Sequence, residues 1–219
     1  MKNKTALIIG ATGLIGSNTV QQLLENKNFT KVKIFTRRSI GINHPKLEEH
    51  LVDFDQIDDW KDNLTGDVLF SAMGTTIRKA GSKAAQYKID YTYQYETALA
   101  AANNGVKIYC LVSSAGANPK SSLFYSKMKG ELDEAVKKLP FEHTFIFRPS
   151  ILAGDRNENR TGEKIGLALA KIFTKIPGLT KYRPIQGATV AKAMIHVAET
   201  IGKRPSFELY TLNEIFKIK

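Results

Sequence analysis

The sequence predicts an α/β fold in which a doubly wound parallel sheet carries a small C-terminal cap. Three observations predict it: short apolar runs alternate with helical patterns, these runs are apolar throughout, and a glycine-rich turn joins the first run to the first helical pattern. Strands that alternate with helices pair in parallel through right-handed crossovers. Strands that are apolar on both faces are typical of sheets covered on both sides.

The expected elements follow that alternation in order. Strands are predicted near residues 5–9, 32–36, 49–53, 67–72, 107–113 and 143–148, and helices near residues 14–26, 55–62, 83–104, 122–138, 163–175 and 188–201. The alternation weakens after Arg148-Pro149. We therefore interpret residues 1–219 as one domain, in which residues from about 150 onward form a small substrate cap. The cap is expected over the carboxyl ends of the strands, where ligands of such sheets bind.

Composition limits the partners and the location. The chain has 219 residues, a formal net charge of +11 and one cysteine, Cys110, which lies in an apolar run and is predicted to be buried. No apolar run approaches the ~20 residues that cross a bilayer, so we expect no stable membrane insertion. The first residues are polar and not signal-like, and a single cysteine excludes an intrachain disulfide, so we expect a cytoplasmic location. The basic residues lack the patterns of nucleic-acid-binding proteins, and the four histidines lack metal-ligand spacing. We therefore predict neither a nucleic-acid partner nor a metal.

The strongest motif is the first glycine turn. The apolar run Ala6–Ile9 leads directly into Gly10-Ala11-Thr12-Gly13-Leu14-Ile15-Gly16. Gly10 lets the chain leave the strand tightly, Gly13 lets backbone N–H groups approach a pyrophosphate, and Gly16 lets the helix pack close to the sheet. The positive end of the helix then faces the phosphates. The turn predicts a dinucleotide site, with an ordinary glycine-rich turn as the alternative.

The tips of the next strands indicate which dinucleotide binds. Arg37 and Arg38 stand where an NAD-selective site usually places an acid, and guanidinium groups suit the 2′-phosphate of NADP. NADP(H) is therefore preferred over NAD(H), unless both arginines are only solvated. Asp53 is either an acceptor for the adenine amino group or a helix N-cap. Met73 and Gly74 end the fourth strand, either along the cofactor ribose or in a plain turn.

The fifth strand and the helix after it carry the candidate chemistry. The strand ends at Ser113 and Ser114, and Tyr125 and Lys129 share one face of the following predicted helix. Reduction of a carbonyl needs a proton donor, and the ordinary tyrosine pKa of ~10 falls beside an ammonium group. A serine hydroxyl, Ser114 first and Ser113 second, orients the substrate oxygen. Lys129 is also expected to hold the ribose hydroxyls, so Tyr125 and Lys129 belong to the predicted cofactor site as well. The alternative is a surface Tyr–Lys pair beside two serines in a turn.

Six segments together resemble an atypical short-chain dehydrogenase/reductase of the Tat-interacting oxidoreductase subgroup. They are Gly10–Gly16, Phe35–Arg38, Met73–Gly81, Leu111–Ala117, Phe124–Glu131 and Phe147–Leu152 with Asp155, Arg156 and Arg160. The resemblance covers most of the chain, and Met73–Gly81 is its most specific part. It implies a Rossmann-like fold and NADP(H)-dependent hydride transfer.

The resemblance also implies a role for each matching position. It assigns Thr12, Gly13, Leu14 and Ile15 to the pyrophosphate, Arg37 and Arg38 to the 2′-phosphate, Met73 and Gly74 to a ribose, Ser150 and Ile151 to the nicotinamide carboxamide, Tyr125 and Lys129 to proton transfer, and Arg156 and Arg160 to the cap. Many relatives have an asparagine on the fourth helix, where this chain has Asp90. Asp90 is interpreted as a lysine partner, a holder of a water chain, or a sign of weakened turnover.

Three functions follow from these patterns. The first is an NADP(H)-dependent oxidoreductase that acts on a small carbonyl or alcohol. The second is a regulatory protein that binds NADP(H) without turnover. The third is a nucleotide-sugar epimerase, for which the short cap leaves little room. The chain is expected as a monomer or as a homodimer paired through helices 83–104 and 122–138.

Overall fold

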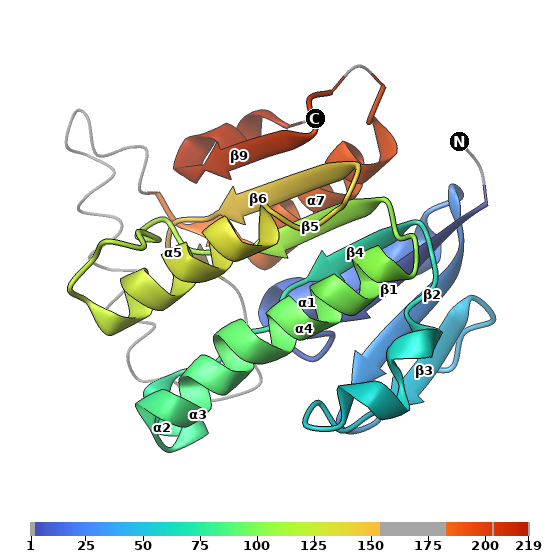
Figure 1. Ribbon diagram of the computed structural model, residues 1–219. Helices are drawn as coiled ribbons and strands as arrows, with labels where there is room; N and C mark the ends of the chain where they lie inside the picture. The colour runs from blue at the N-terminus through green and yellow to red at the C-terminus, as the bar shows by residue number, and fades with distance from the viewer. Residues whose placement is uncertain (1–2, 154–182, 203, 219) are drawn as a thin grey trace.

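The computed structural model describes residues 3–153, 183–202 and 204–218 (Figure 1). Seven parallel strands form its main sheet in the order β3-β2-β1-β4-β5-β6-β9. They are β1 Lys4–Ile9, β2 Phe29–Thr36, β3 Leu47–Leu51, β4 Val68–Ser71, β5 Ile108–Val112, β6 His143–Arg148 and β9 Phe207–Thr211. The predicted doubly wound, Rossmann-like parallel sheet is confirmed.

The strand order reverses once, beside β1. The chain runs outward from β1 to β3 and then crosses to the other side of β1 with β4. In open sheets of this kind, ligands bind outside the carboxyl ends of the two strands that flank the reversal. Ile9 pairs with Ser71 at those ends. The segments that follow, which begin at Gly10 and Ala72, therefore line the expected crevice.

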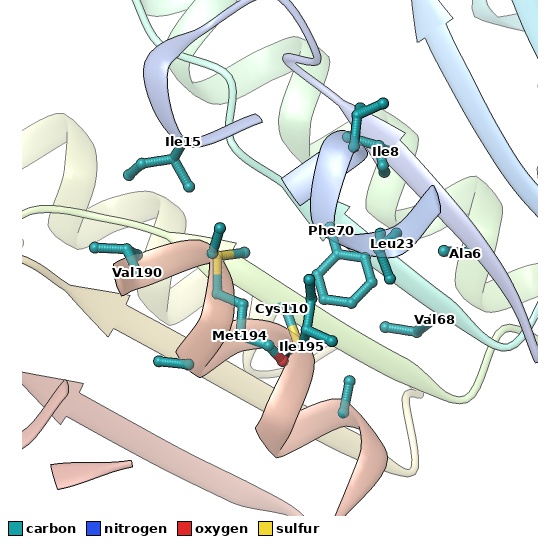
Figure 2. Packing of buried hydrophobic residues seen from close by; sticks show 14 of the residues in the cluster. Ala6, Ile8, Ile15, Leu23, Val68, Phe70, Cys110, Val190, Met194 and Ile195 are labelled. Atoms are coloured by element: carbon teal, nitrogen blue, oxygen red, sulfur yellow. Dashed lines mark hydrogen bonds between the residues drawn. The ribbon is translucent and has the colours of Figure 1, made fainter. Parts of the chain in front are cut away.

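Alternate residues of β1 divide between two cores. Ala6 and Ile8 belong to the core beneath α1 (Leu14–Glu25) and α7 (Gly187–Glu199), and Figure 2 shows Ile8 there with Cys110 and Met194. Leu7 and Ile9 belong to the opposite core, beneath α4 (Tyr93–Asn103) and α5 (Phe124–Val136). Helices therefore cover both faces of the sheet, as the uniformly apolar strands predicted (Figure 1).

Cys110 is fully buried in the first core, which confirms its predicted position in a strand. Burial raises the pKa of its thiol, because the apolar surroundings disfavour a thiolate. The side chain therefore acts as a small apolar group.

Two predicted elements between β2 and β4 differ from the structure. The expected helix 55–62 is replaced by two 3-10 turns, Ile57–Asp59 and Lys61–Asn63. Trp60 lies between them, buried against the Phe35 and Phe54 rings, and its Nε1 donates to the carbonyl of Asp53 at 2.9 Å. This buried indole requires a tight turn instead of a regular helix. β3 also begins and ends two residues before its predicted range of 49–53.

The expected helix 83–104 is interrupted. After the short α2 (Ile77–Ala80), the chain forms α3 (Lys83–Tyr87), a π-helical segment (Lys88–Thr92) and then α4. A π turn holds an extra residue, and such turns occur frequently at functional sites. Here it contains Asp90, which is buried within a polar stretch of sequence.

The described C-terminal residues add one helix and one strand to the main sheet and its helical layers. The predicted helix 188–201 is confirmed as α7, which packs on α1, and β9 adds an unpredicted strand beside β6. β9 is only partly buried, so its sequence lacks the apolar run that marks the inner strands. A second, two-stranded sheet joins β7 (Leu152–Ala153) to β8 (Ile185–Gln186). The last turn is the 3-10 helix Leu212–Lys217.

The predicted helix 163–175 lies outside the described residues, so the substrate cap remains a prediction. Among the helices that the structure describes, none has the length and apolarity that crossing a bilayer requires.

Candidate active site

Gly10 and Gly16 allow three backbone segments to meet at the carboxyl ends of β1 and β4. Gly10 has a φ of +80°, and a Cβ there would lie 2.5 Å from the carbonyl carbon of Ala72. A Cβ on Gly16 would lie 2.1 Å from the carbonyl oxygen of Gly10. Any larger residue at either position would therefore separate β1, the start of α1 and the segment after β4.

Gly13 is less tightly enclosed than Gly10 and Gly16. A Cβ there would lie 3.3 Å from the carbonyl oxygen of Gly10, which is a tight contact but not the overlap found at the other two glycines. Gly13 is the N-cap of α1, none of the described side chains caps that end, and the first turn contains no acid. The free N–H groups of this turn and the positive end of the helix suit a pyrophosphate. The turn therefore fits a dinucleotide.

Within the turn, Thr12 is exposed, Leu14 is partly buried, and Ile15 lies in the core beneath α1. The side chain of Ile15 is therefore structural, and any ligand contact at this position would come from its backbone N–H.

The tip of β2 presents two exposed arginines. Arg37 and Arg38 follow Thr36, the last residue of the strand, whose hydroxyl donates to the carbonyl of Arg38 at 3.0 Å. Nearby, the Asp53 carboxylate accepts the backbone N–H of Asp55 at 2.9 Å. This local contact stabilises a turn. It is not the predicted helix N-cap, because the first 3-10 turn begins at Ile57 and its N-cap is Gln56. The adenine contact of Asp53 remains a prediction.

Tyr125, Lys129 and Asp133 form a stripe along one face of α5, at four-residue spacing. Tyr125 is 43% exposed, whereas the side chains of Lys129 and Asp133 are each only 3% exposed. A Cβ on Gly130 would lie 2.2 Å from the backbone nitrogen of Pro119. The helix therefore packs directly on the loop that follows β5.

That loop begins with the two candidate serines. Ser113 is buried, and its hydroxyl, near Asp133, favours the ionised form of that carboxylate. Ser114 is partly buried, and its carbonyl accepts the N–H of Ala117 at 2.9 Å in a tight turn. The structure thus places Ser113 toward the interior charges and leaves Ser114 the more accessible of the two.

The buried ammonium of Lys129 has a carboxylate partner. Its Nζ lies 3.1 Å from Oδ1 of Asp90, whose side chain is only 1% exposed. The other carboxylate oxygen, Oδ2, accepts the backbone N–H of Thr75 at 2.9 Å. Asp90 therefore joins the Tyr–Lys helix to the β4 tip (residues 72–76), which contains the predicted ribose contacts Met73 and Gly74.

A second ion pair lies next along the stripe. Nε and Nη2 of Arg148, at the end of β6, each lie 2.8 Å from Oδ2 of Asp133. Burial raises the pKa of Asp133, while Ser113, Arg148 and Lys129 favour its ionised form. The two pairs bring the carboxyl end of β6, α5 and the π turn together in the interior.

The remaining predicted contacts lie beside the small sheet. The hydroxyl of Ser150 donates to the carbonyl of Arg183, and the carbonyl of Ile151 accepts the N–H of Ile185 at 2.9 Å. These bonds fix the start of β7 against β8, and the side chain of Ile151 is exposed. Arg156 and Arg160 lie outside the described residues.

Sequence reasoning missed two contacts. One is the ion pair of Asp133 and Arg148, and the other is the hydrogen bond from the Thr75 N–H to the Asp90 carboxylate, which we call the clamp on the β4 tip. A signal for the pair was present. Asp133 lies one helical turn after Lys129 on a helix whose same face was expected to carry the chemistry, and Arg148 ends an apolar strand. The clamp could not be found in this way, because it joins a backbone N–H to a side chain fifteen residues further along.

Comparison with known proteins identifies the family. The model of the NAD(P)H-binding family matches residues 10–200, which include the glycine turn, the π turn and the stripe on α5. Protein FMP52 of Candida albicans is 36% identical over 204 residues, covering 89% of this chain and 88% of the relative. Protein HTATIP2 of Rattus norvegicus is 33% identical over 201 residues, covering 90% and 81%.

The names of these relatives correct one prediction. FMP52 of Candida albicans and fmp52 of Aspergillus niger, which is 36% identical over 197 residues, are both named mitochondrial. This contradicts the expected cytoplasmic location. That expectation came from the lack of a signal-like N-terminus and from the single cysteine, and neither feature identifies a compartment.

Solved structures share the fold. A short-chain dehydrogenase/reductase superfamily protein from Agrobacterium tumefaciens with bound NAD has a TM-score of 0.70 at 13% identity, covering 94% of this chain and 77% of that protein. A UDP-N-acetylglucosamine 4-epimerase from Methanobrevibacter ruminantium has a TM-score of 0.68 at 18% identity, covering 99% and 81%. These solved structures show the fold, while the family model and the relatives show that the chain belongs to the NAD(P)H-binding family and is related to FMP52 and HTATIP2.

Proposed function

We propose that this protein is an NADP(H)-dependent oxidoreductase that interconverts a small carbonyl compound and its alcohol. One observation carries the proposal: Asp90 ties the buried Lys129 to the β4 tip, which lies beside the glycine turn at the reversal of strand order. The helix with the Tyr–Lys pair and the crevice that suits a dinucleotide therefore form one site. The substrate would enter where Tyr125 is exposed.

The chain's residues divide the work of this reaction. When bound, the nicotinamide supplies or accepts the hydride at the substrate carbon. In the reductive direction, the phenol of Tyr125 gives its proton to the substrate oxygen, so that the carbonyl gains one hydride and one proton. The hydroxyl of Ser114 donates a hydrogen bond to the same oxygen as negative charge develops on it. Lys129 holds the ribose hydroxyls.

Tyr125→Phe tests the proton donor. This variant removes one hydroxyl from a half-exposed side chain, so the protein should still fold and still bind NADPH. Reduction of a panel of aldehydes and ketones should fall by about 100-fold or more, as expected on loss of a positioned acid. Tyr95→Phe on α4 is the matched control. Unchanged reduction by Tyr125→Phe would contradict the mechanism and favour a regulatory NADP(H)-binding protein.

The paired substitution of Arg37→Ala with Arg38→Ala tests the preference for NADP(H). Both side chains are exposed at the β2 tip, so the substitutions should leave the fold intact. Affinity for NADPH should fall by about 10- to 100-fold in a fluorescence titration, since charge-assisted hydrogen bonds are lost. Affinity for NADH should change little. The double variant Lys27→Ala/Lys138→Ala, which also removes two exposed positive charges, controls for net charge. Equal losses for both cofactors would remove the 2′-phosphate assignment.

A further inference from the structure

Four charged side chains form a cluster beneath the proposed site, and their formal charges cancel. Asp90 pairs with Lys129 and Asp133 pairs with Arg148, at the distances given above. The charged cluster is therefore these four residues, from the π turn, α5 and the end of β6. All but Arg148 are almost completely buried. Water therefore screens these charges poorly, and each acts strongly on its neighbours.

Asp90 is fixed in place by contacts on several sides. Its carboxylate accepts from Thr75, whose carbonyl in turn accepts Nε2 of Gln86 at 3.0 Å. Its own carbonyl accepts Nε2 of Gln94 at 2.6 Å, and Gln94 accepts the hydroxyl of Ser71 at 2.7 Å. These bonds link the π turn to the end of β4. The carboxylate therefore cannot turn away from Lys129 without breaking the clamp on the β4 tip.

We propose that Asp90 is a positioning residue that acts through Lys129: its carboxylate cancels the ammonium charge and thereby sets the pH range in which Tyr125 holds its proton. This inference rests on the proposed roles of Tyr125 and Lys129. An unpaired ammonium one helical turn from a phenol would favour the phenolate. With Asp90 beside it, Lys129 orients groups in the site but adds little net charge.

The other charges near Lys129 leave this role to Asp90. Asp133 lies one turn further along α5, but its charge is directed to Arg148 on β6. The β5 loop contributes the neutral hydroxyls of Ser113 and Ser114, and the β4 tip contributes backbone. Within the described part of the chain, Asp90 is thus the carboxylate in contact with the Lys129 ammonium.

Three charge states of the pair provide the test. Asp90→Asn keeps the side-chain shape and an oxygen for the Thr75 N–H, but it leaves the pair with a net positive charge. Lys129→Met leaves a net negative charge. The double variant Asp90→Asn/Lys129→Met is neutral, like the wild type. Each of these proteins is titrated without cofactor, and its near-ultraviolet tyrosinate absorbance is recorded. The same protein with Tyr125→Phe added is titrated in parallel, and its absorbance is subtracted. The difference reports Tyr125 alone.

The titration midpoint of Tyr125 should follow the net charge of the pair. It should lie about one pH unit lower in Asp90→Asn than in the wild type, about one unit higher in Lys129→Met, and near the wild-type value in the double variant. The alkaline limb of the pH–rate profile for reduction should shift to lower pH in Asp90→Asn. Asp133→Asn, an identical change at an equally buried carboxylate, should produce a smaller shift.

The outcomes separate the two proposals. A midpoint that is the same in all three charge states overturns the role of Asp90, even if Tyr125→Phe abolishes reduction. Full reduction by Tyr125→Phe overturns the proposed function, whatever the order of the midpoints. If Asp90→Asn fails to fold because it leaves a buried ammonium unpaired, the neutral double variant and Lys129→Met still give the comparison. Asp90→Glu should restore the wild-type midpoint, since it restores the charge.

Discussion

The glycine turn after β1 and the charged cluster beneath α5 contribute to the same site by opposite means. The turn depends on the absence of side chains, because a Cβ on Gly10 or Gly16 would overlap neighbouring backbone atoms. The cluster works through long side chains from three elements, each of which would be costly to bury without its partner.

The difference shows how each part of the site is encoded. The turn is local, so that seven consecutive residues fix its shape. The cluster is assembled by the tertiary fold. Asp90 and Lys129 are 39 positions apart in the sequence, and Asp133 and Arg148 are 15 positions apart. Substitutions in the turn should therefore act through steric overlap, and substitutions in the cluster through charge.

Gly10→Ala should have the largest effect on stability. The new Cβ would overlap the backbone at Ala72, and the residue would keep a φ of +80°, so we expect a loss of about 4 kcal/mol in the free energy of unfolding. Gly41→Ala is the matched control, because its φ is +70° but its Cβ would have no atom within 4 Å. That variant should lose only about 1 kcal/mol in chemical denaturation.

Equal losses in the two variants would mean that backbone strain, and not the overlap with Ala72, makes Gly10 necessary. The turn would then be less rigidly joined to the β4 tip than its geometry indicates.

Arg148→Met should have the next largest effect, and this effect should depend on pH. It leaves Asp133 buried without its guanidinium partner, which should cost about 3 kcal/mol at neutral pH. Burial already raises the pKa of Asp133, and loss of Arg148 raises it further. When the pKa of a carboxyl group is higher in the folded state than in the unfolded state, the folded protein becomes less stable as the pH rises through the folded-state pKa. The difference from wild type should therefore shrink as pH is lowered.

Urea denaturation of Arg148→Met and wild type from neutral to mildly acidic pH would measure this. A loss that stays constant with pH would show that packing of the arginine stem, rather than its charge, stabilises the cluster.

Lys31→Ala should have the smallest effect, and it shows what an ion pair contributes outside the cluster. Nζ of Lys31 on β2 lies 3.0 Å from Oε2 of Glu48 on β3, and both side chains are exposed. The lysine lowers the pKa of Glu48, so the pair stabilises the fold above the ordinary glutamate range and loses this effect as pH falls through the folded pKa. The expected loss at neutral pH is below about 1 kcal/mol. A loss as large as that of Arg148→Met would remove the contrast between buried and exposed pairs.

The sequence predicted the parts of the molecule that local patterns determine. The inner strands are apolar on both faces and were identified, and the glycine turn was placed correctly at the end of β1. β9 was missed because its partly buried residues lack a continuous apolar run, and the 3-10 turns were missed because a buried Trp60 sets their geometry. The roles proposed for Tyr125, Lys129 and Ser114 remain predictions.

Asp90 shows where such reading stops. Its departure from the usual asparagine was visible in the sequence, as was the alternative that it pairs with a lysine. The π turn that carries it was not, because a helix with one extra residue in a turn has nearly the same apolar period as one without it. Only the folded chain shows that Lys129 is the partner and that Thr75 is bound by the same carboxylate.

The packing of α1 against α7 has a consequence for biosynthesis. The apolar face of α1 is covered by residues 187–199, which leave the ribosome long after residues 14–25. At ordinary rates of translation this delay is roughly 10–30 s. During that time the nascent chain exposes the side chains of Ile15, Val20 and Leu23, which are buried in the finished fold, and a chaperone that binds apolar segments would shield them until residues 187–199 emerge.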